Sequence, residues 1–398
     1  MADNNENKVL NVPLLRFPEF TDEWKESVLS DFVERVKRKN KNNLCKLPLT
    51  ISAQYGLVDQ ISFFNKVIAS ENMSNYYLLH KGDFAYNKSY SSEYPWGAIK
   101  RLDCYEQGTL SSLYICFKPY SHVSSDFLTH YFETSKWHQG ISEIAVEGAR
   151  NHGLLNVGIQ DFFETRHCLP QSLLEQEKIA KFLNLIEERI ATQNKIIEDL
   201  KKLKSAIIHR CYSSQTNMIP LSELLKQCSD RNRSGSDLQV LSVSNKYGFI
   251  AQSDQFEDRE VASDDTSNYK VVKKGMFAYN PARINVGSIA LYEMDSNGIV
   301  SPMYVCFTTK SELLPSYLKY YFASQTFKHE MYKRLEGSVR LCLTFEELCN
   351  IEIHLPSIEQ QKNISKYISK IENNLSLVDS IFSKYQQQRR YLLSQMFI

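Results

Sequence analysis

The 398-residue chain lacks the short motifs that mark the common nucleotide-binding and hydrolytic sites. It contains no GxGxxG, no GxxxxGK[ST], no HExxH and no GxSxG pattern. These patterns supply the glycines, metal-binding histidines or nucleophile that phosphate binding and hydrolysis require. Their absence excludes the familiar sites of these classes, so an enzyme would need unfamiliar motifs.

One partial match to a catalytic loop occurs at Asn280-Pro281, within the sequence AYNPAR. The NPP[FY] loop of adenine methyltransferases begins in the same way, but here the second proline and the aromatic residue are missing. The corresponding segment earlier in the chain reads AYNKSY. A turn that closes a strand accounts for this step without a catalytic role, and a methyltransferase remains a minor alternative.

The chain also has little that could bind a metal ion. His122, His130 and His138 recur at equal steps, but steps of this size do not keep three side chains on one helical face. No cysteine pair accompanies them at the spacing of a tetrahedral site. We therefore expect no metal site, no catalytic residues and no cofactor bound by the chain itself.

Strong net charge, long apolar runs and paired cysteines are absent as well. The net charge is +1, which argues against coating nucleic acid by bulk electrostatics but allows local basic surfaces. The nine cysteines occur singly, without a CxxC pair, and indicate reduced thiols. No apolar run approaches the roughly 18 residues of a membrane span, and the start MADNNENK does not resemble a signal peptide. We expect a cytoplasmic protein without membrane contact.

A long uninterrupted stretch, residues 169–211, has no proline after Pro170 and no glycine. Its apolar residues alternate at steps of four and three, which predicts a long helix with a coiled-coil seam. A second stretch with the same alternation ends the chain. The predicted seam consists of Ile179, Leu183, Ile186, Ile190, Ile197 and Leu200 in the first helix and Ile364, Ile368, Ile371, Leu375, Val378 and Phe382 in the second.

The order of motifs in the first half of the chain returns in the second half, about 190 residues later. KGDFAYN (81–87) matches KGMFAYN (274–280), and LYICF (113–117) matches MYVCF (303–307). HYFETS (130–135) likewise matches YYFASQ (320–325), and EGAR and EGSVR loops follow. Each repeat is a domain rich in predicted strands followed by a long helix. Because a domain precedes each helix, an antiparallel helix pair keeps the domains apart.

Basic and polar residues in loops are candidates for DNA contacts. Arginine can fork onto guanine and asparagine onto adenine, whereas lysine more often contacts phosphate. A solvated linker explains the basic segments equally well, and ordinary loop divergence explains the differences between the repeats. The candidates are Arg38, Lys39, Lys88, Ser89, Tyr90, Arg150 and Asn151 in the first repeat, and Arg231, Arg233, Lys246, Arg283, Asn285 and Arg340 in the second.

These features resemble the specificity subunits of type I restriction-modification systems. The similar parts are the N-terminal VPLLRFPEFTDEWKE, the KGxFAYN segments, the GAR and GSVR loops, and a Leu-Pro step before each long helix. Each helix also carries a Q-x-x-I motif, at Gln176 to Ile179 and Gln361 to Ile364. The resemblance covers nearly the whole chain, although one more residue separates the Leu-Pro step from the glutamine in the first copy.

The resemblance implies two target-recognition domains that each read one part of a split DNA sequence. It also implies two docked methyltransferase (modification) subunits and a restriction-translocation subunit. S-adenosylmethionine, ATP and Mg²⁺ would belong to these partners. Phe182, Leu203, Tyr367 and Ile381 lie outside the predicted seam, which suggests that further helices pack there.

We therefore predict an α+β fold in which duplicated, strand-rich domains are separated by an antiparallel coiled coil. The predicted boundaries are 1–168 and 213–356 for the recognition domains and 169–212 and 357–398 for the long helices. The predicted function is non-catalytic recognition of a bipartite double-stranded DNA target. A scaffold that binds only proteins is the main alternative.

Overall fold

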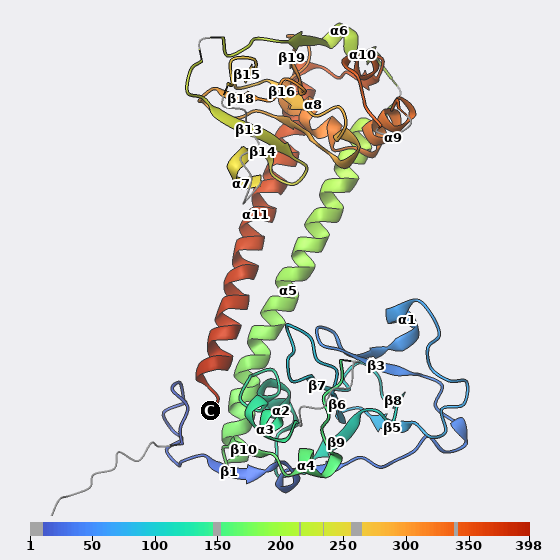
Figure 1. Ribbon diagram of the computed structural model, residues 1–398, viewed down its shortest axis with the longest axis vertical. Helices are drawn as coiled ribbons and strands as arrows, with labels where there is room; N and C mark the ends of the chain where they lie inside the picture. The colour runs from blue at the N-terminus through green and yellow to red at the C-terminus, as the bar shows by residue number, and fades with distance from the viewer. Residues whose placement is uncertain (1–10, 146–152, 215, 234, 256–264, 338–340) are drawn as a thin grey trace, which may run out of the picture. The chain divides into compact units, whose positions relative to one another are not determined.

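The computed structural model describes residues 11–145, 153–214, 216–233, 235–255, 265–337 and 341–398 (Figure 1). The chain divides into two compact units. The first comprises Met1–Thr192 with Ile381–Ile398, and the second comprises Gln193–Ser380. Each unit contains one strand-rich domain and parts of both long helices.

The two long helices are α5 (Leu173–Tyr212) and α11 (Ile358–Gln395). In the first unit, Arg389 of α11 pairs with Glu187 of α5. In the second unit, Lys204 Nζ of α5 lies 2.6 Å from Glu372 Oε1 of α11. The later residue of α5 therefore pairs with the earlier residue of α11. This confirms the predicted antiparallel coiled coil.

The described seam residues lie inside the helix pair or its adjoining cores. Several of them also pack against the core of the adjoining domain, Ile179, Leu183 and Ile186 in the first and Ile368 in the second. Ile179, Leu183, Ile186, Ile197, Ile368 and Ile371 are buried, and Ile190, Leu200, Ile364, Leu375, Val378 and Phe382 are half-buried.

The first domain is built around a four-stranded antiparallel sheet with the order β2-β9-β6-β7. Separate two-stranded sheets are formed by β3 with β4, by β5 with β8, and by β1 with β10 before α5. The strands are β1 (Lys25–Val28), β2 (Val33–Arg35), β3 (Leu49–Ser52), β4 (Gly56–Asp59), β5 (Tyr77–His80), β6 (Phe84–Asn87), β7 (Ala98–Arg101), β8 (Gln107–Leu110), β9 (Ile115–Pro119) and β10 (Arg166–Leu169). The helices are η1 (Leu29–Asp31), η2 (Lys41–Asn43), α1 (Gln60–Phe64), α2 (Ser125–Tyr131), α3 (His138–Ile144) and α4 (Ile159–Phe163).

The second domain repeats this plan with a sheet of order β12-β19-β16-β17 and a second sheet of order β14-β13-β18-β15. Its strands are β11 (Met218–Pro220), β12 (Leu225–Cys228), β13 (Gln239–Ser244), β14 (Gly248–Ala251), β15 (Lys270–Val272), β16 (Phe277–Tyr279), β17 (Ile289–Leu291), β18 (Gly298–Val300), β19 (Val305–Thr309) and β20 (Glu352–His354). The helices are α6 (Leu221–Leu224), α7 (Gln252–Gln255), η3 (Ile284–Val286), α8 (Pro315–Phe322), α9 (Gln325–Lys333) and α10 (Phe345–Cys349).

The KGxFAYN segments form the central strands β6 and β16. Their side chains alternate between two cores, because successive residues of a strand face opposite sides. Phe84 stacks on Phe117 at 5.4 Å, and Phe277 stacks on Phe307 at 5.2 Å. The intervening Ala85 faces the other core. Equal packing around the two motifs confirms the predicted duplication.

Two local sequence patterns predict helices that differ from the observed elements. The apolar pattern of residues 12–32 predicts a short amphipathic helix after its prolines, but Lys25–Val28 forms β1 because it pairs with β10. The pattern of residues 126–141 predicts one helix, but the chain forms α2 and α3 with a break between them. At this break Trp137 is buried and donates from Nε1 to the Phe132 carbonyl at 3.0 Å. Tertiary packing thus outweighs local helix preference.

Candidate nucleic-acid interface

The loop between β16 and β17 carries Arg283 and Asn285 and lies beside the tip of the β13–β14 hairpin. Ser288 Oγ donates to the Val243 carbonyl at 2.8 Å and ties the loop to β13. Gly287 adopts a φ of +92°, and a Cβ there would lie 3.4 Å from Asn245 Cβ. The structure thus brings the loop close to the hairpin that carries Lys246.

A groove of about 420 Å³ opens between this loop, the hairpin tip, α8 and α9. Phe322, Phe327 and Met331 contribute apolar surface to its lining. Its polar lining residues are Asn245, Asn285, Lys319 and Lys328. The described lining residues include no Asp or Glu. Lys319 is paired with Glu293 at 2.7 Å, whereas Lys328 is exposed. Cations and amides around a groove are suited to phosphate and base-edge contacts.

The glycine-bearing loop of the second domain adjoins the same region. The Leu343 amide donates to the Pro281 carbonyl at 3.1 Å, and Tyr279 Oη donates to the Leu343 carbonyl at 3.2 Å. Leu343 therefore lies beside the β16–β17 loop. Arg340, predicted as a DNA contact, lies outside the described residues.

The first domain places the equivalent loops together. The Tyr90 amide donates to the Gly153 carbonyl at 3.0 Å, and the Leu155 amide donates to the Lys88 carbonyl at 2.9 Å. The candidate residues Lys88, Ser89 and Tyr90 of the β6–β7 loop thus lie against residues 153–155. Tyr90 is exposed. Arg150 and Asn151, which were predicted nearby, lie outside the described residues.

Comparisons with known proteins agree with this duplicated layout. Residues 232–381 match a family model described as the type I restriction modification DNA specificity domain. Over 306 residues the chain is 25% identical to the type I restriction enzyme MjaVIII specificity subunit of Methanocaldococcus jannaschii, covering 68% of this chain and 69% of that protein. By both comparisons the chain is similar to the specificity subunits of type I restriction-modification systems.

Two solved structures share the fold of this chain. One is the type I restriction-modification S subunit from M. genitalium, with a TM-score of 0.57, 15% identity, and coverage of 97% of this chain and 99% of that chain. The other comes from work on complex assembly and conformational transition of the type I R-M system, with a TM-score of 0.54 and 16% identity. That match covers 94% of this chain and 97% of the other.

The basic segments before the sheets of this chain have internal partners. Arg38 pairs with Asp83, a buried carboxylate that also accepts from the His80 amide at 2.7 Å. Burial raises the pKa of Asp83, although Arg38 acts in the opposite direction. Lys39 Nζ donates to the Asn75 carbonyl at 2.8 Å and lies 3.8 Å from the centre of the Tyr77 ring. Both cations therefore bind other segments of the same domain.

In the second domain, Arg231 donates to Asn268 Oδ1 at 2.9 Å, and Arg233 is exposed. Sequence reasoning missed the buried asparagines that shape both basic segments. Asn40 Nδ2 donates to the Cys45 carbonyl and Asn232 Nδ2 to the Ser236 carbonyl, both at 2.9 Å. The signal was present, because an asparagine follows a basic residue at the same place in each repeat.

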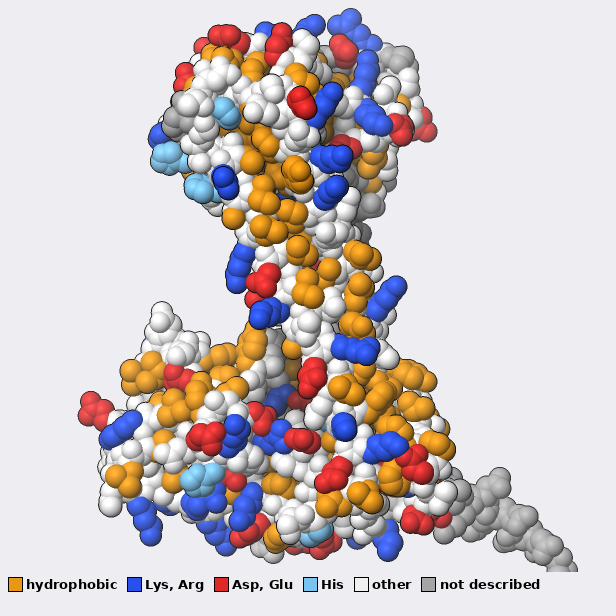
Figure 2. Space-filling model, turned by 180° about the vertical axis from the view of Figure 1, so that it is seen from behind, with side chains coloured by type: hydrophobic (Ala, Val, Ile, Leu, Met, Phe, Trp, Pro, Cys, Tyr) orange, Lys and Arg blue, Asp and Glu red, His pale blue; other side chains and the backbone are white. Residues whose placement is uncertain are grey.

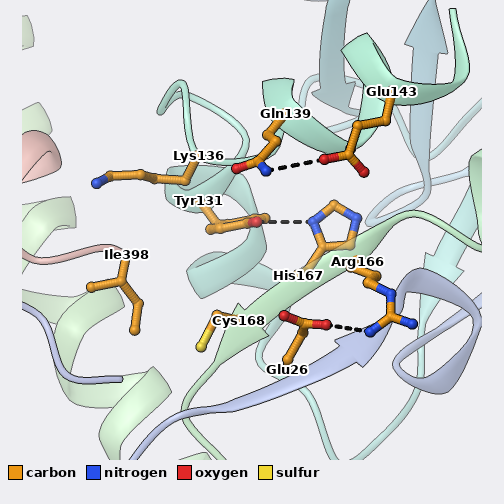
Figure 3. A pocket seen from close by; sticks show the side chains of 10 residues that line it. Glu26, Tyr131, Lys136, Gln139, Glu143, Arg166, His167, Cys168 and Ile398 are labelled. Carbon is orange, nitrogen blue, oxygen red and sulfur yellow. Dashed lines mark hydrogen bonds and ion pairs between the residues drawn. The ribbon is translucent and has the colours of Figure 1, made fainter. Parts of the chain in front are cut away.

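A cavity of about 200 Å³ in the first unit contains the group of side chains that most resembles a catalytic set (Figure 3). Tyr131 Oη and His167 Nδ1 are 2.9 Å apart, and Thr165 Oγ1 lies 2.8 Å from His167 Nε2. Thr165 donates its hydroxyl proton to the Phe162 carbonyl at 2.7 Å, so it accepts from His167 Nε2. His167 Nδ1 must then accept from Tyr131.

The protonation of this group is that of a structural network. Burial lowers the pKa of His167 to about 4 and raises the pKa of Tyr131. Both side chains are therefore neutral near neutral pH. The surrounding charges, Glu26 with Arg166 at 2.6 Å, are exposed. This arrangement stabilises the packing of α2 on β10.

The described residues contain no cluster of His, Cys, Asp or Glu that could hold a metal ion. Among the same residues, no helix is both long and apolar enough to cross a membrane.

Proposed function

We propose that the chain reads a bipartite double-stranded DNA target, with one strand-rich domain for each half-site. The single observation that carries this proposal is the equivalent position of the β6–β7 and β16–β17 loops. Each loop extends a central strand of the same sequence and lies beside a glycine-bearing loop. The scaffold is shared, but the side chains that it presents differ.

The grooves beside these loops differ in charge. The second groove has Lys319 and Lys328 and no described acidic lining residue. In the first domain, a pocket of about 180 Å³ beside β7, the strand that follows the β6–β7 loop, is lined by Lys100 and Arg101 together with Asp103 and Glu133. Equal scaffolds with different polar surfaces favour two readers of different sequences over two copies of one binding site.

We further propose that two methyltransferase subunits and a restriction-translocation subunit assemble on this chain. Exposed apolar side chains lie outside the seam, as Figure 2 shows along the long helices. On α5 they are spaced by two or three helical turns, which places them on one stripe. The exposed residues are Leu174, Leu185, Ile196 and Leu203 on α5, and Tyr367, Leu377 and Tyr391 on α11.

Two of the residues that were expected to lie exposed outside the seam, Phe182 and Ile381, are only partly exposed to solvent. Phe182 is half-buried because Phe17 packs against it edge-on, with ring centroids 5.9 Å apart. Ile381 is half-buried, whereas Leu203 and Tyr367 are exposed. The segment that carries Phe17 is fixed to α5 by Arg16, whose Nε donates to Glu175 Oε1 at 2.7 Å.

The test is to produce the chain with its methyltransferase partners in a host and sequence the methylome. The expected result is methylation at one split sequence, which requires this chain. A DNA-binding assay with and without the methyltransferase partners separates this function from that of a scaffold that binds only proteins. Tight binding of S-adenosylmethionine by the isolated chain would contradict a non-catalytic role.

A further inference from the structure

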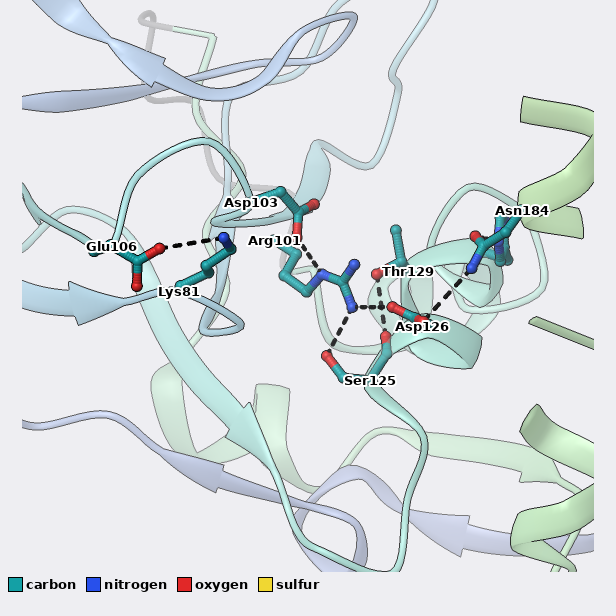
Figure 4. Close-up of polar contacts among 9 residues, drawn as sticks. Lys81, Arg101, Asp103, Glu106, Ser125, Asp126, Thr129 and Asn184 are labelled. Atoms are coloured by element: carbon teal, nitrogen blue, oxygen red, sulfur yellow. Dashed lines mark hydrogen bonds and ion pairs between the residues drawn. The ribbon is translucent and has the colours of Figure 1, made fainter. Parts of the chain in front are cut away.

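Four charged residues of the first domain connect strand β7 with the long helices. Lys100 and Arg101 end this strand, which follows the β6–β7 loop. Lys100 pairs with Glu133. Arg101 Nη1 donates to Asp126 Oδ1 at 2.6 Å (Figure 4). Both acids belong to the α2 region, which lies between the sheet and the coiled coil.

Glu133 and Asp126 also contact residues of the long helices. Glu133 Oε2 lies 3.5 Å from Arg389 Nη2 of α11, and Arg389 also pairs with Glu187 of α5. Asp126 Oδ2 accepts from Asn184 Nδ2 of α5 at 3.5 Å (Figure 4). A continuous series of polar contacts therefore runs from Lys100 through Glu133 and Arg389 to α5. All of these residues lie in the first unit.

The series is partly shielded from water, so its interactions are screened less than surface ion pairs. Lys100 is 12% exposed and Glu133 is 24% exposed. Burial acts to lower the pKa of Arg389, but Glu187 and Glu133 outweigh it and raise the pKa. Burial raises the pKa of Tyr94 in the β6–β7 loop, and the charge of Glu133 adds to this effect.

The second domain lacks these four charges. Lys100 and Arg101 pair with Ala85 and Phe84, and the corresponding partners of Ala278 and Phe277 are Ala290 and Leu291. The matching of HYFETS with YYFASQ places Ser316 and Ala323 at the positions of Asp126 and Glu133.

The coiled coil nevertheless keeps an equivalent ion pair. Glu372 is bound by Lys204, and the domain contributes only Tyr320, whose hydroxyl donates to Glu372 Oε2 at 2.9 Å. In the second unit, the contacts that start from Glu372 of α11 therefore reach only Tyr320 of α8 among the described residues of the domain. In the first unit, the contacts that start from Arg389 reach Lys100 of strand β7.

We propose that Arg389 is a positioning residue for the first recognition domain, which it holds in register with its end of the coiled coil through Glu133 and Lys100. In the second domain, Lys319 of α8 pairs with Glu293 just after β17, but among the described residues no ion pair continues from these two residues to α11. Disturbing the series should therefore alter recognition of one half-site only. This inference rests on the proposed function.

The main variant is the double substitution Lys100→Ala with Glu133→Ala, which installs the residues of the second domain and leaves Arg389 paired with Glu187. The measurement is the methylation rate of the complex on the cognate site and on sites with one base changed in either half. Discrimination against changes in the first half should fall roughly five- to tenfold, a typical size for coupling between sites. Discrimination in the second half should be unchanged.

Arg389→Met should give the same pattern, and Arg389→Lys should retain most of the discrimination because the cation remains. Lys204→Met is the matched control at the equivalent position, and it should leave discrimination unchanged in both halves. Thermal unfolding of each variant shows whether the fold is retained. Unchanged first-half discrimination in both the double variant and Arg389→Met, or equal loss in both halves, would overturn the inference. If the unmodified complex methylates no split site, the proposed function itself fails.

Discussion

Gln176 and Gln361 make the same hydrogen bond near the start of the two long helices. Gln176 Oε1 accepts from the Ser124 amide at 2.8 Å, and Gln361 Oε1 accepts from the Leu314 amide at 2.9 Å. Their Nε2 atoms donate to the carbonyls of Pro170 and Pro356. Each glutamine therefore ties the helix that follows the sheet to the long helix, which gives the Q-x-x-I motif a physical role.

Gln361→Ala should lower the free energy of unfolding by about 1 to 3 kcal/mol, because it leaves the Leu314 amide without its acceptor in a buried position. Gln361 is 0% exposed. Urea denaturation measures the change. Gln387→Ala, an exposed substitution on the same helix, is the control. Equal effects of the two substitutions would show that the buried hydrogen bond contributes little.

The first domain should lose stability in mild acid because of His167. Its folded pKa is about 4, below the roughly 6.5 of an unfolded histidine, so between these values only the unfolded chain takes up the proton. The contribution of His167 to the free energy of unfolding is therefore fully present above about pH 6.5. It is lost as the pH falls toward 4, by up to about 3 kcal/mol. His167→Ile introduces the residue type that the second repeat has at the equivalent position, Ile353. This substitution should make the free energy of unfolding, measured by denaturation at several pH values, depend less steeply on pH. An unchanged slope would assign the acid sensitivity to other groups.

The coiled coil should determine the spacing of the two half-sites. Ile190→Pro removes a helix hydrogen bond in α5 and should cost at least about 3 kcal/mol. Modification of the split site should be lost, while each recognition domain keeps its own sheet. Methylation assays and circular dichroism provide the measurements, with Ile190→Ala as the control for the lost side chain. Normal methylation by the proline variant would show that helix continuity is not needed.

The residues alone predict the repeated plan well, because strand and seam patterns are local and occur twice. The KGxFAYN motif predicts a buried strand wherever it occurs, and both copies form one. Partners that are distant in the chain are harder to predict. The residues show that Arg38 is basic, but not that Asp83 folds against it. The DNA contacts suggested for the loops stay predictions.

The same limit explains why the series from Lys100 to Arg389 could not be foreseen. Its members come from a strand, a helix end and the C-terminal helix, and no short-range pattern links them. Aligning the repeats shows that Ala323 replaces Glu133, but only the fold shows that this change removes a contact with the coiled coil.

Arg283 offers a test of base contact against phosphate contact in the second half-site. The side chain is exposed at the start of η3, beside the groove. If Arg283 forks onto a guanine, Arg283→Ala should relax specificity at one position and cost about 1 to 3 kcal/mol. A phosphate contact would weaken all sequences alike and reduce the salt dependence of binding. Binding measured on a set of single-base variants distinguishes the two, with Lys274→Ala, an exposed residue paired with Asp295, as the control.

The two domains should be exchangeable one at a time. Replacing about residues 40–168 with the equivalent domain of a relative should change the first half-site, while residues 233–354 continue to read the second. The polar series makes this prediction more specific, because residues 40–168 include Lys100 and Glu133 but not their partner Arg389. A donor domain with an acid at the position of Glu133 should give full methylation at the hybrid site. A donor with alanine there should methylate it with weaker discrimination in the first half, and restoring the acid should recover it. Methylome sequencing of both hybrids makes the comparison, and a swap that alters both half-sites would mean that the two domains are energetically coupled.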